Sequence, residues 1–187
     1  HNNQPVAQIL VERTWNTLLL IGVGQILAII LGVSLGVIAA WKLGTPVDYS
    51  ALIFSLVAWS LPTFWLGIIL LFWGSTNLGL PIGGMVTPGM NYATIWAQVL
   101  DVSRHMILPT LTYTIVFLGE YMLIMRSSLI DVLSEDYVLT AKAKGLNSYQ
   151  ILKDHALRNA MLPMVTIIAL NLGFTVAGAV QIETVFS

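Results

Sequence analysis

The stretch from Leu18 to Trp41 reads LLLIGVGQILAIILGVSLGVIAAW and carries no charged side chain. A helix of about 20 apolar residues, rising about 1.5 Å per residue, crosses a hydrocarbon core about 30 Å thick. Three further runs of this kind follow, at about residues 52–73, 107–125 and 164–183. The 187-residue chain is 57% hydrophobic and 9% charged, whereas soluble domains carry about 25% charged residues. The sequence therefore predicts an all-α, multi-pass transmembrane bundle, with four spans in one domain that covers residues 1–187.

Charge and residue usage exclude several classes of function. The formal net charge is −1, so the chain has no overall basic field that would attract nucleic acid. There is no cysteine, which excludes thiolate metal sites and a cysteine nucleophile. The three histidines, His1, His105 and His155, lie far apart without a second ligand at helical spacing, so we expect no metal site.

Lysines and arginines are distributed unevenly between alternate loops, and this distribution predicts the orientation. The loops after the first and third spans hold six of them, and the other side holds two, Arg13 and Arg104. By the positive-inside rule the six face the cytoplasm, so the chain begins outside and the first span runs inward. An external start without a signal sequence predicts that at least one span precedes residue 1.

Two local signals modify this simple picture of the spans. Pro62 predicts a kink in the second span, with Ser60 or Thr63 near the carbonyl that the kink frees. The outer loop, residues 74–104, begins with a glycine- and proline-rich turn region. Its second half, residues 91–103, has the spacing of a short helix that lies in the membrane interface and does not cross it.

Most of the polar chemistry lies in one cytoplasmic loop, residues 126–163, which holds nine of the seventeen charged residues. Its signals predict two short helices around a glycine. Ser134 is the expected cap of the first helix, and Gly145 is its left-handed stop. Asn147 or Ser148 is expected to cap the second, which should end before Pro163. Two capped helices make a stiff element, which favours a role in transmitting force or position to something in the cytoplasm.

The same loop resembles a known family. The stretches EDYVLTAKAKGL, residues 135–146, and HALRNAMLP, residues 155–163, are similar to the "EAA" loop of permease subunits of binding-protein-dependent ABC importers, in the dipeptide, oligopeptide and nickel group. Only Ala141, Gly145 and the pair at residues 162–163 fit the general form of that motif, and the departures match the peptide group's own pattern. Further resemblances include PTFWLG at 62–67, Arg126 with the two serines after it, and ETVFS at 183–187.

The resemblance implies the central portion of a type I ABC importer permease of about six spans, in a bacterial or archaeal cytoplasmic membrane. In that family the loop is a coupling helix that docks on a cytoplasmic ATPase. Carried onto this sequence residue by residue, the docking positions are Thr140, Ala141, Lys142, Ala143, Lys144, Gly145 and Leu146. The implied partners are ABC ATPase subunits, a second permease subunit, homologous or identical, and an extracytoplasmic solute-binding protein.

The chain itself has no Gly-x-x-x-x-Gly-Lys-Ser/Thr loop with which to cradle nucleotide phosphates. We therefore predict that it is not an enzyme and holds no cofactor. ATP and magnesium are expected to bind to the partner ATPase, whose closure would move the coupling helices as rigid bodies.

Small and polar residues inside the spans suggest packing contacts and a solute path. The pairs Gly32 with Gly36, and Gly173 with Ala177, predict close helix contacts. For Glu120, near the cytoplasmic end of its span, we expect snorkelling or an ion pair. Candidates for a translocation path or gate are Ser60, Pro62, Thr63, Asn171, Gln181 and Glu183, although helix–helix hydrogen bonds explain Asn171 and Gln181 at least as well.

The substrate is not determined by these residues. Short peptides are the primary hypothesis, and the same family also serves nickel chelates, glutathione and other small solutes. A secondary transporter driven by protons or sodium is the main alternative from another class, but it would need ionisable groups or broken helices near the midplane. A non-transporting membrane scaffold would leave the stiff cytoplasmic loop unexplained.

Overall fold

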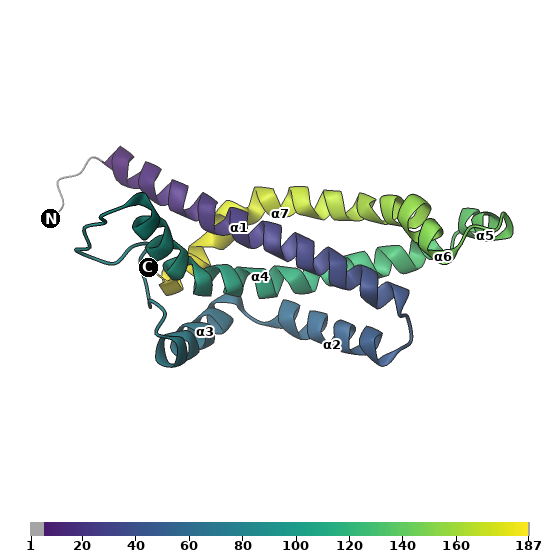
Figure 1. Cartoon of the computed structure of the whole chain (residues 1–187), viewed down its shortest axis with the longest axis horizontal. Coiled ribbons are helices and arrows are strands. Elements are labelled where there is room, and N and C mark those ends of the chain that lie inside the picture. Colours follow the sequence, from purple (N-terminus) through teal and green to yellow (C-terminus); the bar gives the residue numbers. More distant parts are fainter. Residues whose placement is uncertain (1–5, 187) are drawn as a thin grey trace. The chain divides into compact units, whose positions relative to one another are not determined.

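The computed structural model describes residues 6–186, without the side chains of residues 6–14, 16, 174–181 and 183. Every regular element within this range is helical, which confirms the predicted all-α fold. In chain order the helices are α1 (Val6–Trp41), α2 (Pro46–Ser60), α3 (Thr63–Leu78), α4 (Ile95–Leu133), α5 (Asp136–Ala143), α6 (Ser148–Gln150), the π-helix η1 (Ile151–Ala156) and α7 (Leu157–Phe186), as labelled in Figure 1.

Three helical segments are long and apolar enough to cross a membrane: Thr17–Trp41, Ile95–Leu133 and Ser148–Gly173. A fourth crossing results if α2 and α3 together form one bent span. The chain leaves helical geometry at Leu61 and Pro62, so the interruption expected at Pro62 is present. Proline has no amide hydrogen and its ring disfavours helical geometry in the residue before it, which explains why α2 ends where it does.

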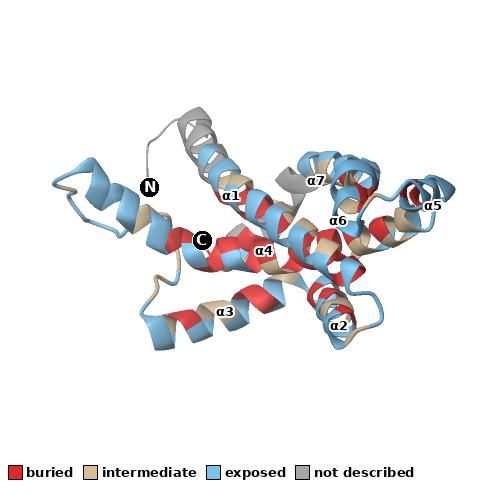
Figure 2. Cartoon of the chain, turned by 45° about the vertical axis from the view of Figure 1, so that its right-hand side comes forward, coloured by how far each residue is buried: buried red, intermediate tan, exposed pale blue. Residues whose placement is uncertain are grey.

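The chain divides into two compact units, to which α1, α4 and α7 each contribute. The first unit comprises residues 1–26, 61–115 and 174–187, and the second comprises residues 27–60 and 116–173. In the second unit, parts of α1, α4 and α7 run side by side (Figure 1) around a shared core. Its buried members are Ala28, Ala40, Tyr121, Met125, Leu129, Ala156, Ala160 and Met164. α4 is the most buried helix, whereas α2 and much of α7 show exposed faces (Figure 2).

Glycines in α1 allow this core to close tightly. A Cβ atom on Gly32 would lie 2.7 Å from the Cβ of Tyr121, and a Cβ on Gly36 would lie 2.8 Å from the carbonyl oxygen of Met122. The close packing predicted for this pair is therefore confirmed. Gly173 has no atom within 4 Å of its would-be Cβ, and the side chain of Ala177 lies outside the described residues.

Replacing Gly36 by alanine is expected to destabilise the protein, since the new methyl group meets the backbone of α4. Overpacking of this kind costs about 1–3 kcal/mol of unfolding free energy. Gly22→Ala is the matched control, because nothing lies within 4 Å of the position its Cβ would take. Thermal unfolding of the two variants in detergent should show a lowered midpoint only for Gly36→Ala. Equal midpoints would contradict the packing described here.

The first unit has its own close contacts between α1 and α4. Tyr113, 1% exposed, donates a hydrogen bond to the Oε1 atom of the buried Gln25 at 2.6 Å. A Cβ atom on Gly24 would lie 2.9 Å from the ring of Tyr113. Gly74 of α3 likewise leaves room for Leu108 of α4, whose side chain would be 2.5 Å from a Cβ. Each pair brings residues distant in sequence into direct contact.

The expected interfacial helix at residues 91–103 is not a separate element, and this expectation was wrong. α4 begins at Ile95 and runs without interruption to Leu133, with Pro109 inside it. Thr94 precedes the first turn and accepts a hydrogen bond from the amide of Ala97 at 3.2 Å. Between this start and Pro109 the sequence has no glycine that could end the helix in a left-handed conformation. A transmembrane helix also tolerates the loss of the one hydrogen bond that proline cannot donate.

The second helix of the cytoplasmic loop was expected to end before Pro163, and this too was wrong. α6, η1 and α7 follow one another without a break from Ser148 to Phe186, and Pro163 lies inside α7. The carbonyl of Ala160, one turn before the proline, accepts a hydrogen bond at 3.0 Å from Ser128 of α4. This bond ties α7 to α4 near the proline, although the carbonyl that loses its amide partner is that of Asn159, four residues before Pro163. A helix within a span tolerates such a proline. The amide of Leu157 bonds to the carbonyl of Leu152, in the i to i−5 pattern of a π turn.

Candidate functional site

The short helix α5 has a small core of its own. Val138 is fully buried, Ala141 is 5% exposed and Ile151 of η1 is 2% exposed, with Leu146 packed against these three. A hydrogen bond of 2.9 Å from Asn159 to the hydroxyl oxygen of Tyr137 adds a polar tie between α5 and α7. α5 is therefore held against η1 and the start of α7.

The turn after α5 closes with a Schellman motif, built on the predicted left-handed stop. Gly145 has φ +85°, as expected. Its amide donates to the carbonyl of Lys142 at 2.9 Å, and the amide of Leu146 donates to the carbonyl of Ala141 at 3.2 Å. Leu146 also packs on the α5 core, which is the apolar contact that usually accompanies this motif.

The caps of the loop agree with the prediction at one of two positions. Asn147 forms a capping box with Gln150, with hydrogen bonds of 2.9 and 3.0 Å in the two directions, so the cap on the second helix is confirmed. Ser134 does not cap α5, because its hydroxyl donates back to the carbonyl of Ile130 in α4. The N-cap is Glu135, without a side-chain bond. Ser134 directly follows the end of α4 at Leu133, and its hydroxyl is already bonded to the last turn of that helix, which removes it from capping.

The predicted docking residues divide into an inward and an outward set. Ala141 and Leu146 belong to the core between α5 and η1 and so position the loop. Exposed members are Thr140, Lys142, Ala143, Lys144 and Gly145. The sequence reasoning missed two exposed apolar side chains on the same loop, Leu139 at 59% and Tyr149 at 65%. Leu139 stands where the general EAA motif has its glutamate, and this departure was the signal available in the sequence.

Ala141→Glu is expected to displace α5, because a carboxylate would be buried between Val138 and Ile151 without a partner. Ala143→Glu, two residues further along and on the exposed side of α5, is the matched control for the core. Limited proteolysis of the loop should be strongly accelerated by the first change and little affected by the second. Similar protection in both variants would contradict the inward position of Ala141.

A buried ion pair ties the loop after α1 and the start of α2 to α4. Both oxygens of Asp48, 1% exposed, are paired with Arg126, at 2.5 Å from Nε and 2.9 Å from Nη2. The amide of Gly44 donates to Asp48 at 3.0 Å. Bidentate geometry fixes both partners. The sequence predicted roles for Arg126 in the orientation and in the family motif but no ion pair, although Asp48 is the only acidic residue between Arg13 and Asp101.

Glu120 is paired differently from the expectation. It is 8% exposed and accepts a hydrogen bond of 2.8 Å from Asn171 of α7, whose amide also lies 3.1 Å from the hydroxyl of Tyr121. Snorkelling is excluded by this burial, and among the described residues Glu120 has no ion pair. Glu120 lies six residues before Arg126 and its side chain faces α7, so the amide of Asn171 reaches it. Asn171 thus makes the helix–helix contact that was left open as an alternative to a path position.

The outer loop of the first unit is fastened by one carboxylate. Asp101 accepts hydrogen bonds from the amide and hydroxyl of Thr87, both at 2.7 Å, and from Tyr92 at 2.6 Å. The bond to this carboxylate raises the pKa of the Tyr92 phenol. At another point the amide of Gly84 donates to the carbonyl of Phe186 at 3.0 Å. The turn region is therefore tied to α4 and to the end of α7.

The remaining path candidates lie at the break between α2 and α3 or near the end of α7. Ser60 ends α2 and bonds to the carbonyl of Val57, while Pro62 caps α3 and Thr63 begins it. The side chains of Gln181 and Glu183 lie outside the described residues. No group of three or more metal-binding side chains occurs in the described part of the chain. A role in a translocation path stays a prediction for all six candidates.

Three or four helices long and apolar enough to cross a membrane define a multi-pass membrane protein. Residues 32–187 match the family described as binding-protein-dependent transport system inner membrane component, and the chain belongs to that family.

Similar proteins extend along nearly the whole chain. A putative peptide permease protein of Brucella suis biovar 1 is 38% identical over 186 residues, which is 99% of this chain and 57% of that protein. The dipeptide transport system permease protein DppB of Escherichia coli K12 is 38% identical over 200 residues, covering 98% of this chain and 59% of that protein. The oligopeptide transport system permease protein AppB of Bacillus subtilis is 35% identical, and the match covers 98% of this chain and 57% of that protein. The chain thus spans less than two thirds of the length of these relatives.

Proposed function

We propose that this chain forms part of the translocation path of an ATP-driven importer for dipeptides or oligopeptides. Its family is one of inner membrane transport components, and the relatives described above are named as peptide permeases. An extracytoplasmic solute-binding protein would deliver the peptide, and a second permease subunit would complete the path.

The observation that carries the proposal is the bracket made by α5 and η1. It is cored by Val138 and Ile151 and closed by a Schellman motif and a capping box. Outside this core it presents Leu139, Thr140, Lys144 and Tyr149 to solvent. A short helix with its own core and exposed apolar side chains is suited to insertion in a groove of a protein partner. The partner would be the cytoplasmic ATPase, which binds ATP and magnesium.

Mechanically, the bracket would transmit movement because its joint to α7 contains no flexible linker. η1 continues directly into α7, and the contact between Tyr137 and Asn159 spans the corner. Closure of the ATPase dimer on ATP would displace α5, and α7 would follow as part of the same rigid body. The carboxylate–guanidinium pair of Asp48 and Arg126 would hold α2 to α4 during this movement.

The experiment that tests the function uses the full-length permease, reconstituted with its partner subunits and binding protein in vesicles. Peptide uptake should require ATP and should continue when the proton and sodium gradients are collapsed. Uptake driven by an ion gradient alone, with no ATPase subunit co-purifying, would favour the secondary transporter. Parallel assays with a nickel chelate and with glutathione test the other substrates considered above. Saturable transport of one of these in place of peptides would contradict the proposed peptide substrate.

A further inference from the structure

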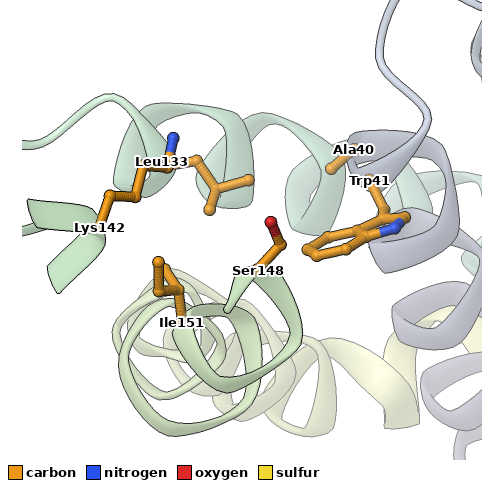
Figure 3. Close-up of a pocket in the computed structure, with 6 residues that line it drawn as sticks. All are labelled: Ala40, Trp41, Leu133, Lys142, Ser148 and Ile151. Atoms are coloured by element: carbon orange, nitrogen blue, oxygen red, sulfur yellow. The ribbon is translucent and has the colours of Figure 1, made fainter. Parts of the chain in front are cut away.

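A pocket of about 260 Å³ lies between the bracket and the ends of α1 and α4, and all of its lining residues belong to the second unit. It is lined by Ala40, Trp41, Leu133, Lys142, Ser148 and Ile151 (Figure 3). Its volume lies below the range of about 300–1,000 Å³ that is typical for drug-sized ligands. A small polar group fits the pocket better than a whole peptide does.

The lining combines an apolar base with polar groups at the opening. Ala40 and Ile151 are nearly fully buried, whereas Trp41, Lys142 and Ser148 are exposed. In Figure 3 the hydroxyl of Ser148 points into the space between Leu133 and Trp41. An ammonium group, a hydroxyl donor and no acidic side chain make this lining complementary to an anion.

The pocket also adjoins the membrane. Trp41 is the last residue of a span, where tryptophan is typical of the membrane–water interface, and Lys42 follows it. Along α1 below it, Leu31, Leu35 and Ile38 are each 38–45% exposed. A molecule with an anionic head in the pocket could therefore lay its hydrocarbon chains on this apolar face. Basic pockets between spans on the cytoplasmic side are known binding sites for anionic lipid head groups.

We propose that this pocket binds the phosphate head group of an anionic inner-leaflet phospholipid, with Lys142 as the charge partner and Ser148 as the hydrogen-bond donor. In this arrangement the side chain of Lys142 belongs to the lipid site. Lys144 does not line the pocket, so it is the lysine available to contact the ATPase. The bound lipid would brace the bracket against α1 and α4.

Native mass spectrometry of the full-length permease in detergent tests this proposal without any ATPase present. Phosphatidylglycerol should be retained in preference to phosphatidylcholine. Lys142→Gln should weaken that retention about fivefold, the effect of one lysine near an anionic lipid surface. Ser148→Ala should weaken it as well, and Lys144→Gln, the matched control on the same loop, should leave it unchanged. Both lysine changes keep good helix formers, so the fold is preserved.

A photo-crosslinking residue at position 133 gives a second readout. It should label phosphatidylglycerol, and the same residue at the exposed position 149 should not. Equal retention of both lipids, or equal effects of the two lysine variants, would overturn the site. Full displacement of the lipid by excess inorganic phosphate would show a free-anion site and would overturn the lipid assignment. These outcomes are independent of whether α5 docks on an ATPase, which the uptake assay tests.

Discussion

Gly145→Pro is expected to abolish transport while the spans remain inserted in the membrane. Gly145 has φ +85°, which the proline ring cannot adopt, and its amide donates to the carbonyl of Lys142. Both the left-handed stop and one bond of the Schellman motif are lost. A penalty of about 3 kcal/mol or more would depopulate the ordered bracket about a hundredfold, enough to uncouple ATP hydrolysis from uptake.

The measurement is ATP-driven uptake beside the ATPase activity of the assembled complex. Gly79 provides a matched control, since it too has a left-handed φ, +62°, with open space around it, but it ends α3 in the first unit. In Gly79→Pro, the ratio of peptide uptake to ATP hydrolysis should stay the same, even if total uptake falls. Normal transport by Gly145→Pro would mean that docking on the ATPase does not use this loop.

Arg126→Met is expected to cause the largest loss of stability among single changes outside the bracket. It leaves the carboxylate of Asp48, 1% exposed, buried without its partner, which typically costs about 3–5 kcal/mol. Asp48→Asn should cost less, because the Arg126 side chain is 18% exposed and its guanidinium can turn to water. The double variant should recover much of the loss, as a buried pair replaced by neutral groups is often tolerated.

Unfolding midpoints of the unchanged protein, the two single variants and the double variant form a complete cycle. The order Arg126→Met, Asp48→Asn, double variant, from least to most stable, is the expected result. Additive losses in the double variant would show that the two residues act independently, and the ion pair would then not be the element that holds α2 to α4.

The sequence predicted the helical fold and the bracket because both depend on local signals. Apolar runs without charge define spans, and Gly145 and Asn147 act through bonds to residues within a few positions. Gly32 and Gly36 were also readable, since small residues four apart on a span indicate close contact.

What the sequence missed depends on contacts between distant segments. Asp48 and Arg126 are 78 residues apart, and Glu120 and Asn171 are 51 apart, so neither pair has a local signature. Helix ends at prolines were misjudged for a related reason. Pro109 and Pro163 lie inside helices, because a membrane span tolerates the loss of the one hydrogen bond that proline cannot donate, and helix propensity in water does not include that tolerance.

The π turn at Ile151–Ala156 sets the rotational phase between the bracket and the membrane helix that follows it. A π turn contains one residue more than a turn of α-helix. Residues before and after it are therefore offset by one position in the helical repeat. Deleting a single residue here would restore a regular helix and rotate α5 and α6 by about 100° around the axis of α7, the rotation of one residue in an α-helix. The π turn therefore decides in which direction the exposed side chains of α5 point relative to α7.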